Sequence, residues 1–192
     1  MNFPYVIQHL IRGDKMFTVN VNNKVKLKLL DLDDRDTLFR LVDNNRSYLK
    51  KWLPWVDSVQ KKTVYDGIIR SWAKEYIEKE SLNLGILYNE KIVGMISLHE
   101  IDFDNRKTSI GYWIEEQSQG KGIVTNCLEF LIDYAFSKLK LNRIEIRCNP
   151  ENTKSIQIPI ALGFVKEGVL RNSEYLNGKS QDLVVFSMIK TT

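Results

Sequence analysis

The chain has 192 residues, 43% of them hydrophobic and 27% charged, with a formal net charge of +4 and a sequence pI near 8.9. This composition excludes global disorder and predicts one folded domain with a substantial core. Because the basic residues are dispersed and interleaved with acids, the mild positive charge suits an anionic ligand and does not indicate a nucleic-acid-binding protein.

Residues 1–15 precede the first regular pattern of the chain. An alternating stretch begins at Met16 and Phe17, so Met16 could be an authentic start. We expect residues 1–15 to be a peripheral extension and residues 16–192 to form a single domain.

Two strands and a helix are predicted next. Residues 17–21 and 25–30 alternate apolar and polar side chains, and the asparagine pair 22–23 between them is typical of a turn. The acidic stretch 31–36 favours a helix start, and residues 38–42 continue it with helical spacing.

Two tryptophans surround a proline in the following segment. A helical piece over residues 48–53 should end before Pro54, because proline disfavours helical backbone in the residue that precedes it. Trp52 and Trp55 flank this point. We expect them in core or lid packing, and a place in a substrate pocket is the alternative.

The middle of the chain changes from a helical period to a strand period. Residues 63–79 carry apolar side chains at intervals of four and predict a long helix. Residues 82–88 and 91–98 predict two strands of a tight hairpin. Gly94 within the second strand predicts a bulge or a close approach of two backbones.

A strand, a helix and another strand follow. Residues 99–105 are polar and are expected to form a connection, and residues 108–114 form the next predicted strand. Residues 123–139 show one broad apolar face typical of a helix. Residues 143–148 alternate as a strand does.

The C-terminal part predicts a helix and two strands. The helix covers residues 152–162, and Gly163 is well placed to cap its C-terminus. Residues 164–170 and 181–189 are strand-like, with a turn at 177–178 between them. The order of elements predicts a mixed α/β (α+β) fold in which helices cover a sheet.

Composition also bears on the compartment. Cys127 and Cys148 are the only cysteines and form no Cys-x-x-Cys motif, so we expect both to be buried structural residues in a reducing environment. No apolar run approaches the roughly 20 residues of a membrane span. Residues 1–10 lack the features of a signal peptide. The expectation is a cytoplasmic protein with no membrane contact.

A glycine-containing loop between a strand and a helix is the first chemical signal. The motif Gln117-x-x-Gly120-x-Gly122 stands directly before the predicted helix at Ile123. Glycines let a ligand approach the backbone, and the N–H groups and dipole of a helix N-terminus attract anions. The loop therefore predicts a phosphate or pyrophosphate site, with an ordinary turn as the alternative. It matches neither a Walker loop nor G-x-G-x-x-G, because Thr125 stands where the third glycine would fall.

Several stretches together resemble the GNAT acetyltransferases, and within them the RimJ/RimL-type group that acetylates protein N-termini, notably those of ribosomal proteins. The resemblance runs from about residue 17 to the end of the chain. It rests on the glycine motif, on residues 49–55, on Ile110-Gly-Tyr-Trp113, on Asn152-Thr-Lys-Ser155 followed by Leu162-Gly-Phe164, and on Glu174-Tyr-Leu-Asn-Gly178 with Asp182.

The resemblance implies a mostly antiparallel sheet that splays between two parallel strands, here 108–114 and 143–148, with helices on both faces. Acetyl-CoA would enter this gap as co-substrate, and no metal is implied. Backbone amides from Gln119 to Ile123 would hold the pyrophosphate, and a backbone N–H near Trp113 or Ile114 would stabilise the oxyanion. The residues that the resemblance assigns to the cofactor are Trp113, Ile114, Gln117, Gln119, Gly120, Lys121, Gly122, Ile123 and Asn152. Lys121 has a solvated surface role as its alternative, and Asn152 could also be a helix N-cap.

The implied chemistry is direct attack of an amine on the thioester. No covalent enzyme intermediate is needed, and the two histidines, His9 and His99, adjoin no nucleophile motif. Ser155 matches the family's serine that stabilises the leaving thiolate, and a backbone-capping serine is the alternative. Glu174 matches an acid proposed to act as base through water, and an exposed loop glutamate is the alternative.

One position departs from the family pattern. Relatives usually carry a glutamate where Ser109 stands. Its absence puts direct deprotonation from this strand in doubt and favours Glu174, Glu100 or water as the proton acceptor.

Three functions remain open from the sequence. The first is acetylation of a protein N-terminus, and the resemblance to the RimJ/RimL-type group implies that of a ribosomal protein. The second is acetylation of a small amine, such as a polyamine or an aminoglycoside. The third is a non-catalytic acetyl-CoA-binding regulator, which would need Gly120, Gly122 and Asn152 but not Ser155. A homodimer is also left open.

Overall fold

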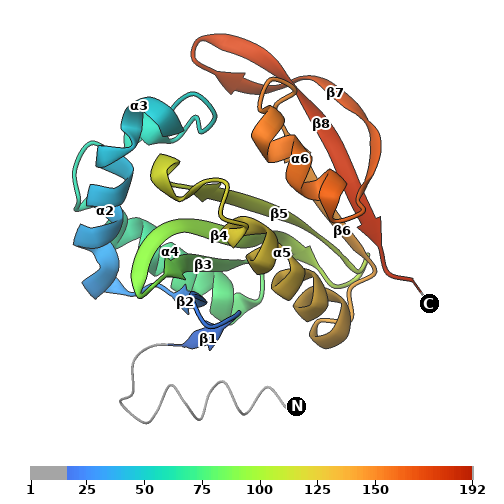
Figure 1. Ribbon diagram of the computed structural model, residues 1–192, viewed down its shortest axis with the longest axis horizontal. Coiled ribbons are helices and arrows are strands. Elements are labelled where there is room, and N and C mark those ends of the chain that lie inside the picture. The colour runs from blue at the N-terminus through green and yellow to red at the C-terminus, as the bar shows by residue number, and fades with distance from the viewer. Residues whose placement is uncertain (1–16, 192) are drawn as a thin grey trace.

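The computed structural model describes residues 17–191 (Figure 1). The predicted extension at residues 1–15 lies outside the described residues. Within residues 17–191 no helix is long and apolar enough to cross a membrane.

One eight-stranded sheet organises the fold, with the strand order β1-β2-β3-β4-β5-β6-β8-β7. Every neighbouring pair is antiparallel except β5 and β6, which are parallel. The mostly antiparallel sheet agrees with the predicted fold class. The strands are β1 Thr18–Asn20, β2 Val25–Leu29, β3 Leu82–Tyr88, β4 Lys91–Asp102, β5 Lys107–Ile114, β6 Arg143–Cys148, β7 Val165–Leu176 and β8 Lys179–Ile189.

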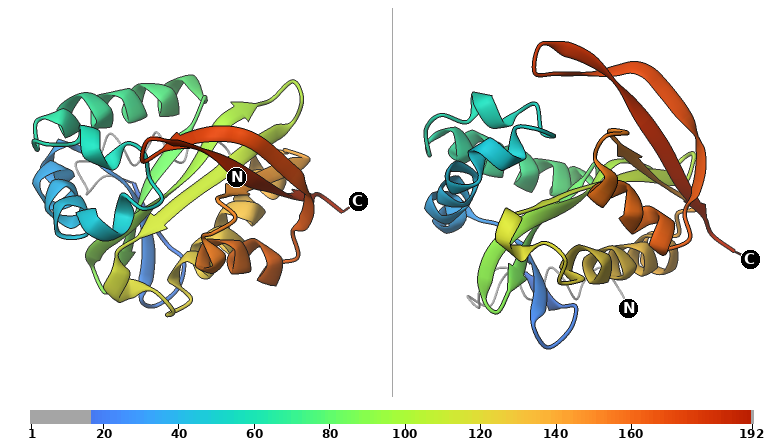
Figure 2. Two further views of the ribbon diagram at one scale, coloured as in Figure 1. Left: turned by 90° about the horizontal axis from the view of Figure 1, so that it is seen from above. Right: turned by 45° about the horizontal axis from the view of Figure 1, so that its top comes forward.

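Helices cover both faces of the sheet (Figures 1 and 2). The segments α2, α3 and α4 pack in one apolar cluster with residues of β4 and β5, and α5 and α6 pack in the other, larger cluster. The α-helices are α2 Arg35–Asn44, α3 Arg46–Leu49, α4 Val64–Glu78, α5 Ile123–Asp133 and α6 Thr153–Ala161. Short helical turns are η1 Leu32–Asp34, η2 Val56–Ser58, η3 Glu116–Ser118 and the π-helical turn η4 Tyr134–Lys138.

Alternation along β5 separates the two clusters. Ile110 and Ile114 are buried in the cluster of α5, whereas Trp113 packs in the cluster of α2 and α4. Successive side chains of a strand point to opposite faces, so this single strand contributes to both layers. It thereby forms a wall that a ligand could contact from either side of the sheet.

The two predicted tight turns are present. Asn89 and Glu90 join β3 to β4 with positive φ values of 48° and 65°, which are typical of a type I′ hairpin turn. Asn177 and Gly178 do the same between β7 and β8, with φ values of 50° and 79°.

Gly94 shows both features that its place in a strand predicted. The pairing with β3 skips Val93, which forms a bulge. A Cβ added at Gly94 would lie 2.2 Å from the carbonyl oxygen of Trp113. The close approach of β4 to β5 therefore requires glycine here.

The predicted splay of the sheet is confirmed. The parallel strands β5 and β6 pair at only three positions, from Lys107 with Arg143 to Ser109 with Glu145. Both strands then continue, β5 to Ile114 and β6 to Cys148, without pairing with each other. The gap between their C-terminal halves is the site of the cleft described below.

Several predicted boundaries were wrong. Residues 99–102 belong to β4 and are not a connection, because the strand continues past a register shift into a second pairing with β5. Strand β7 extends to Leu176, so Glu174 lies in a strand of a long hairpin and not in a loop. The helix before Pro54 ends already at Leu49. The helix from Ile123 becomes π-helical after Asp133.

Candidate active site

A cleft of about 840 Å³ opens where β5 and β6 diverge. Its wall includes Tyr112 and Ile114, which face the layer of α5, and Gly111 and Trp113, which face the opposite layer. The cleft therefore passes through the sheet, so that two molecules could meet from opposite faces. Of the residues predicted for the site, it brings together Trp113, Ile114, Gln119, Gly120, Lys121, Gly122, Ile123, Asn152, Ser155 and Glu174. Gln117 is not among the residues that line it.

The glycine loop supplies an anion-binding surface at one end of the cleft. Gly120 and Gly122 have φ values of 71° and 69°, and Gly122 is the N-cap of α5. Among residues 17–191, no group accepts a hydrogen bond from the backbone N–H of Gly120, Lys121, Gly122 or Ile123. Free N–H groups at a helix N-terminus, with no Cβ at two of four positions, fit a phosphate group.

The Lys121 ammonium group contacts an aromatic ring outside the glycine loop. Its ammonium nitrogen lies 5.6 Å from the centre of the Tyr88 ring, a cation–π distance. The side chain is thus held over an aromatic ring of β3, which weakens the case for a direct phosphate contact.

A polar chain crosses the mouth of the cleft. Lys154 of α6 donates to the Gln119 amide oxygen at 2.8 Å, and the Gln119 amide nitrogen donates to the Tyr48 hydroxyl. The segment after α3 is also tied to the far hairpin, because Asn177 donates to the Lys50 carbonyl at 3.2 Å. These bonds join four segments that are far apart in the sequence. No sequence pattern indicated Tyr48 or Lys154.

The backbone of β5 directs some of its N–H groups to the gap. Trp113 pairs with Met95 of β4, and the Glu115 N–H donates to the Val93 carbonyl at 2.8 Å, so these backbone groups face β4. By alternation the N–H of Ile114 faces the opposite side, toward the open gap. Of the two predicted oxyanion donors, Ile114 has the required direction and Trp113 does not.

Ser155 lies in a small hydroxyl cluster. Its Oγ donates to the Tyr112 hydroxyl at 3.3 Å and lies 3.6 Å from the Cys148 sulfur. The Tyr112 hydroxyl in turn donates to the Ser155 carbonyl at 3.0 Å. Burial raises the pKa of Tyr112 above its usual range, so the phenol stays protonated. A second proton donor therefore stands beside Ser155, which the sequence did not indicate.

The Asn152 side chain caps α6. Its Oδ1 accepts a hydrogen bond from the Ser155 N–H at 3.3 Å, and the residue also lines the cleft. The capping role is therefore confirmed. It fixes the first turn of α6, which carries Ser155 to the cleft.

The two free cysteines differ in position. Cys127 lies in the core, where burial raises the pKa of its thiol to about 12. Cys148 is also buried, but its thiol lies on the cleft wall beside Ser155. Burial raises its pKa as well, against the opposing effect of the Ser155 and Tyr112 hydroxyls. A purely structural role therefore fits Cys127 better than Cys148.

An acid and a tryptophan also line the cleft. Glu174 is half-buried, and desolvation raises the pKa of its carboxyl above the usual range. Trp52 lines the cleft, whereas Trp55 packs on Trp113 with ring centres 6.0 Å apart. One tryptophan thus takes the pocket position and the other the packing position that were alternatives in the sequence. Arg147, which no motif indicated, also lines the cleft.

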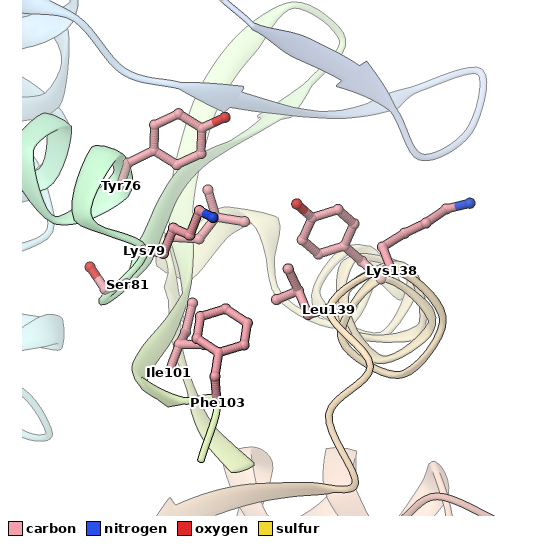
Figure 3. A pocket seen from close by; sticks show the side chains of 9 residues that line it. Tyr76, Lys79, Ser81, Ile101, Phe103, Lys138 and Leu139 are labelled. Atoms are coloured by element: carbon pink, nitrogen blue, oxygen red, sulfur yellow. The ribbon is translucent and has the colours of Figure 1, made fainter. Parts of the chain in front are cut away.

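A second hollow of about 140 Å³ lies apart from the cleft, between the end of α4 and the π-helical turn (Figure 3). Tyr76, Ile101, Phe103 and Leu139 contribute to its walls. It shares no lining residue with the cleft.

Comparison with known proteins agrees with this geometry. Residues 24–165 match the family described as Acetyltransferase (GNAT) domain. The relative named "Putative ribosomal N-acetyltransferase YdaF", from Bacillus subtilis (strain 168), is 40% identical over 176 residues, 91% of this chain and 96% of the relative. The ribosomal-protein-serine acetyltransferase of Escherichia coli (strain K12) is 29% identical over 180 residues, 90% of this chain and 96% of the relative.

A relative with another named substrate is also similar. Spermidine N(1)-acetyltransferase of Escherichia coli (strain K12) is 28% identical over 164 residues, 84% of each chain. Among solved structures, Microcin C7 self immunity acetyltransferase MccE in complex with acetyl-CoA and AMP matches with a TM-score of 0.86. It is 33% identical, and the match covers 90% of this chain and 96% of that one.

Proposed function

The chain belongs to the GNAT acetyltransferase family and is an N-acetyltransferase, and from that premise we propose that it transfers the acetyl group of acetyl-CoA to the N-terminal α-amine of a protein, with ribosomal proteins as the first candidates. The observation that supports this most is the cleft through the sheet. Its wall carries both an anion-binding loop and a half-buried carboxyl. Two relatives with ribosomal names support the acceptor class. A cytoplasmic location belongs to the same proposal.

On the donor side, the unpaired amides from Gly120 to Ile123 would hold the pyrophosphate of acetyl-CoA. The thioester supplied there carries the acetyl group. The N–H of Ile114 faces the gap and would donate to the developing oxyanion. The Ser155 hydroxyl would stabilise the leaving thiolate from the α6 side of the gap.

On the acceptor side, the chemistry needs an uncharged amine. An α-amine has a pKa of roughly 7.7–8.0, against roughly 10.4 for lysine, so a larger fraction of it is neutral near pH 7. Glu174 lines the cleft, and its raised pKa makes it a better proton acceptor than an ordinary carboxylate. It would take a proton from the nitrogen directly or through water.

Glu174→Gln is expected to lower kcat at pH 7 by about tenfold or more, because it removes the rate enhancement that general base catalysis contributes. Desolvation raises the pKa of Glu174, so its carboxylate form, and the rate that depends on it, is lost as the pH falls through that raised value. The variant should therefore lose this part of the acid limb of the pH–rate profile and shift its optimum upward.

Glu129→Gln is the matched control, because Glu129 is an exposed acid of α5 that does not line the cleft. It should behave as the unchanged protein. A pH–rate profile of Glu174→Gln that overlays the wild-type profile would remove Glu174 from the reaction.

Incubation with acetyl-CoA and a panel of amines, followed by mass spectrometry, tests the function. The panel contains peptides with ribosomal-protein N-termini, the same peptides with blocked α-amines, spermidine and an aminoglycoside. We expect a single acetyl group on the free N-termini. Preferred acetylation of spermidine would favour the small-molecule alternative that one relative suggests. Acetyl-CoA binding without any acetylated product would support a non-catalytic regulator.

A further inference from the structure

A row of polar side chains crosses the face of the sheet opposite the glycine loop. His99 of β4 pairs with Ser109 of β5, and Ser109 pairs with Glu145 of β6. Residues paired on neighbouring strands point to the same face. Gly111 and Trp113 share this face by the period of two, and both line the cleft. The row therefore lies along the acceptor side of the cleft, next to the position where the strand lacks the family's glutamate.

The His99 ring lies directly over Gly111. A Cβ built at Gly111 would be 2.8 Å from Nε2 of His99 and 3.2 Å from its Cδ2. A side chain at this position would displace the ring, so the imidazole lies against a residue of the cleft wall. Among residues 17–191, neither ring nitrogen has a hydrogen-bond partner. The ring thus lies beside the cleft wall with both nitrogens available for hydrogen bonds to water.

Desolvation favours the neutral form of His99, which can accept a proton. Desolvation lowers the pKa of His99 below its usual range, while Glu100 of the same strand and Glu75 of α4 act in the opposite sense. Glu145, beyond Ser109, is not free to accept, because Arg143 and Arg147 both donate to its carboxylate. His99 is therefore the available base in this row.

We propose that His99 accepts, through water on the acceptor face, the proton that the acceptor's ammonium group must lose before it attacks the thioester. This inference rests on the proposed function. A bound α-ammonium first loses one proton, which His99 passes on to solvent. Its nitrogen then forms the C–N bond while the C–S bond breaks. A second proton leaves the nitrogen to Glu174 and balances the departing thiolate, so the reaction releases one proton in total.

The distance requires water between the groups. Gly111 precedes Ile114 by three residues, about 10 Å along an extended strand. A chain of about three hydrogen bonds spans this distance. His99 thus acts as a proton-relay residue and not as a group that touches the reacting atoms.

The test compares His99→Gln with the wild-type protein on two acceptor peptides. One carries an ordinary α-amine, and the other carries an aminooxy group, which is uncharged at pH 7 and needs no first deprotonation. With the ordinary peptide, His99→Gln should lower kcat/KM about tenfold or more at pH 7, as loss of a proton acceptor does. The loss should shrink at pH 9, where the amine is neutral without help. With the aminooxy peptide, the variant should equal the wild type.

Two further variants separate a proton relay from a structural role. Ser109→Ala, in the same row, should leave the profile unchanged. Adding Ser109→Glu to His99→Gln should restore activity, because a carboxylate returns to the row. An equal loss at both pH values and with both peptides would overturn the proposal, as would no loss at all. A wild-type protein that acetylates neither peptide would instead refute the proposed function, and the inference with it.

Discussion

Ser155→Ala is expected to lower kcat by about a hundredfold while leaving the Kd of acetyl-CoA nearly unchanged, since it removes an interaction with charge that develops only as the thiolate leaves. The hydroxyl lies on the cleft wall within bonding distance of the Tyr112 hydroxyl. Stopped-flow or steady-state rates, together with calorimetric binding of acetyl-CoA, measure the two quantities separately.

The fold should tolerate this change. The N-cap bond of α6 uses the backbone N–H of Ser155, and not its hydroxyl, so alanine keeps the cap. Thr153→Ala is the matched control, because Thr153 is an exposed hydroxyl on the same helical turn that does not line the cleft. Wild-type turnover of Ser155→Ala would remove Ser155 from the mechanism and leave the Tyr112 hydroxyl as the donor to the leaving thiolate.

Tyr112 is a second group that could donate a hydrogen bond or a proton to the leaving thiolate. Its hydroxyl contacts the same serine, and its raised pKa keeps the phenol protonated near neutral pH. If Ser155→Ala keeps a few per cent of the wild-type rate, the remaining stabilisation of the thiolate is attributable to Tyr112. A double variant with Tyr112→Phe would then lower the rate further.

Local sequence patterns predicted the parts of this fold that depend on local physics. The hairpin turns at Asn89 and Asn177 follow from residues that tolerate positive φ. The Asn152 cap and the Gly163 C-cap follow from helix-end chemistry. The splay of β5 and β6 came from the resemblance to a family, because no property of either strand alone states where their pairing stops.

The missed residues are those that tertiary pairing brings to the site. His99 was assigned to a loop, because the register shift that lets β4 continue is not visible in its polar sequence. Tyr48 reaches the cleft through a bond to Gln119, 71 positions away in the chain. Cys148 was assigned to the core, and it is buried, but the core here ends at a ligand cleft. In each case the local pattern was compatible with both roles.

Gly122→Val is expected to raise the Kd of acetyl-CoA by about tenfold to a hundredfold, because it removes a free backbone approach at an anion site. Gly122 has a φ of 69° and caps α5, and a Cβ there would meet no protein atom within 4 Å. The space around it is therefore available to a ligand. A branched side chain would fill that space and would also strain the left-handed backbone that aims the amides of Gly122 and Ile123.

Gly163→Val separates the loss of space for the ligand from the strain of the left-handed backbone. Gly163 has a φ of 82° at the C-terminus of α6, and a Cβ there also meets nothing within 4 Å. Both variants should therefore lose about 1–2 kcal/mol of folding stability, the cost of a left-handed residue with a side chain. Only Gly122→Val should weaken acetyl-CoA binding, because Gly163 does not line the cleft. Equal affinities of the two variants for acetyl-CoA would mean that the glycine loop does not hold the cofactor.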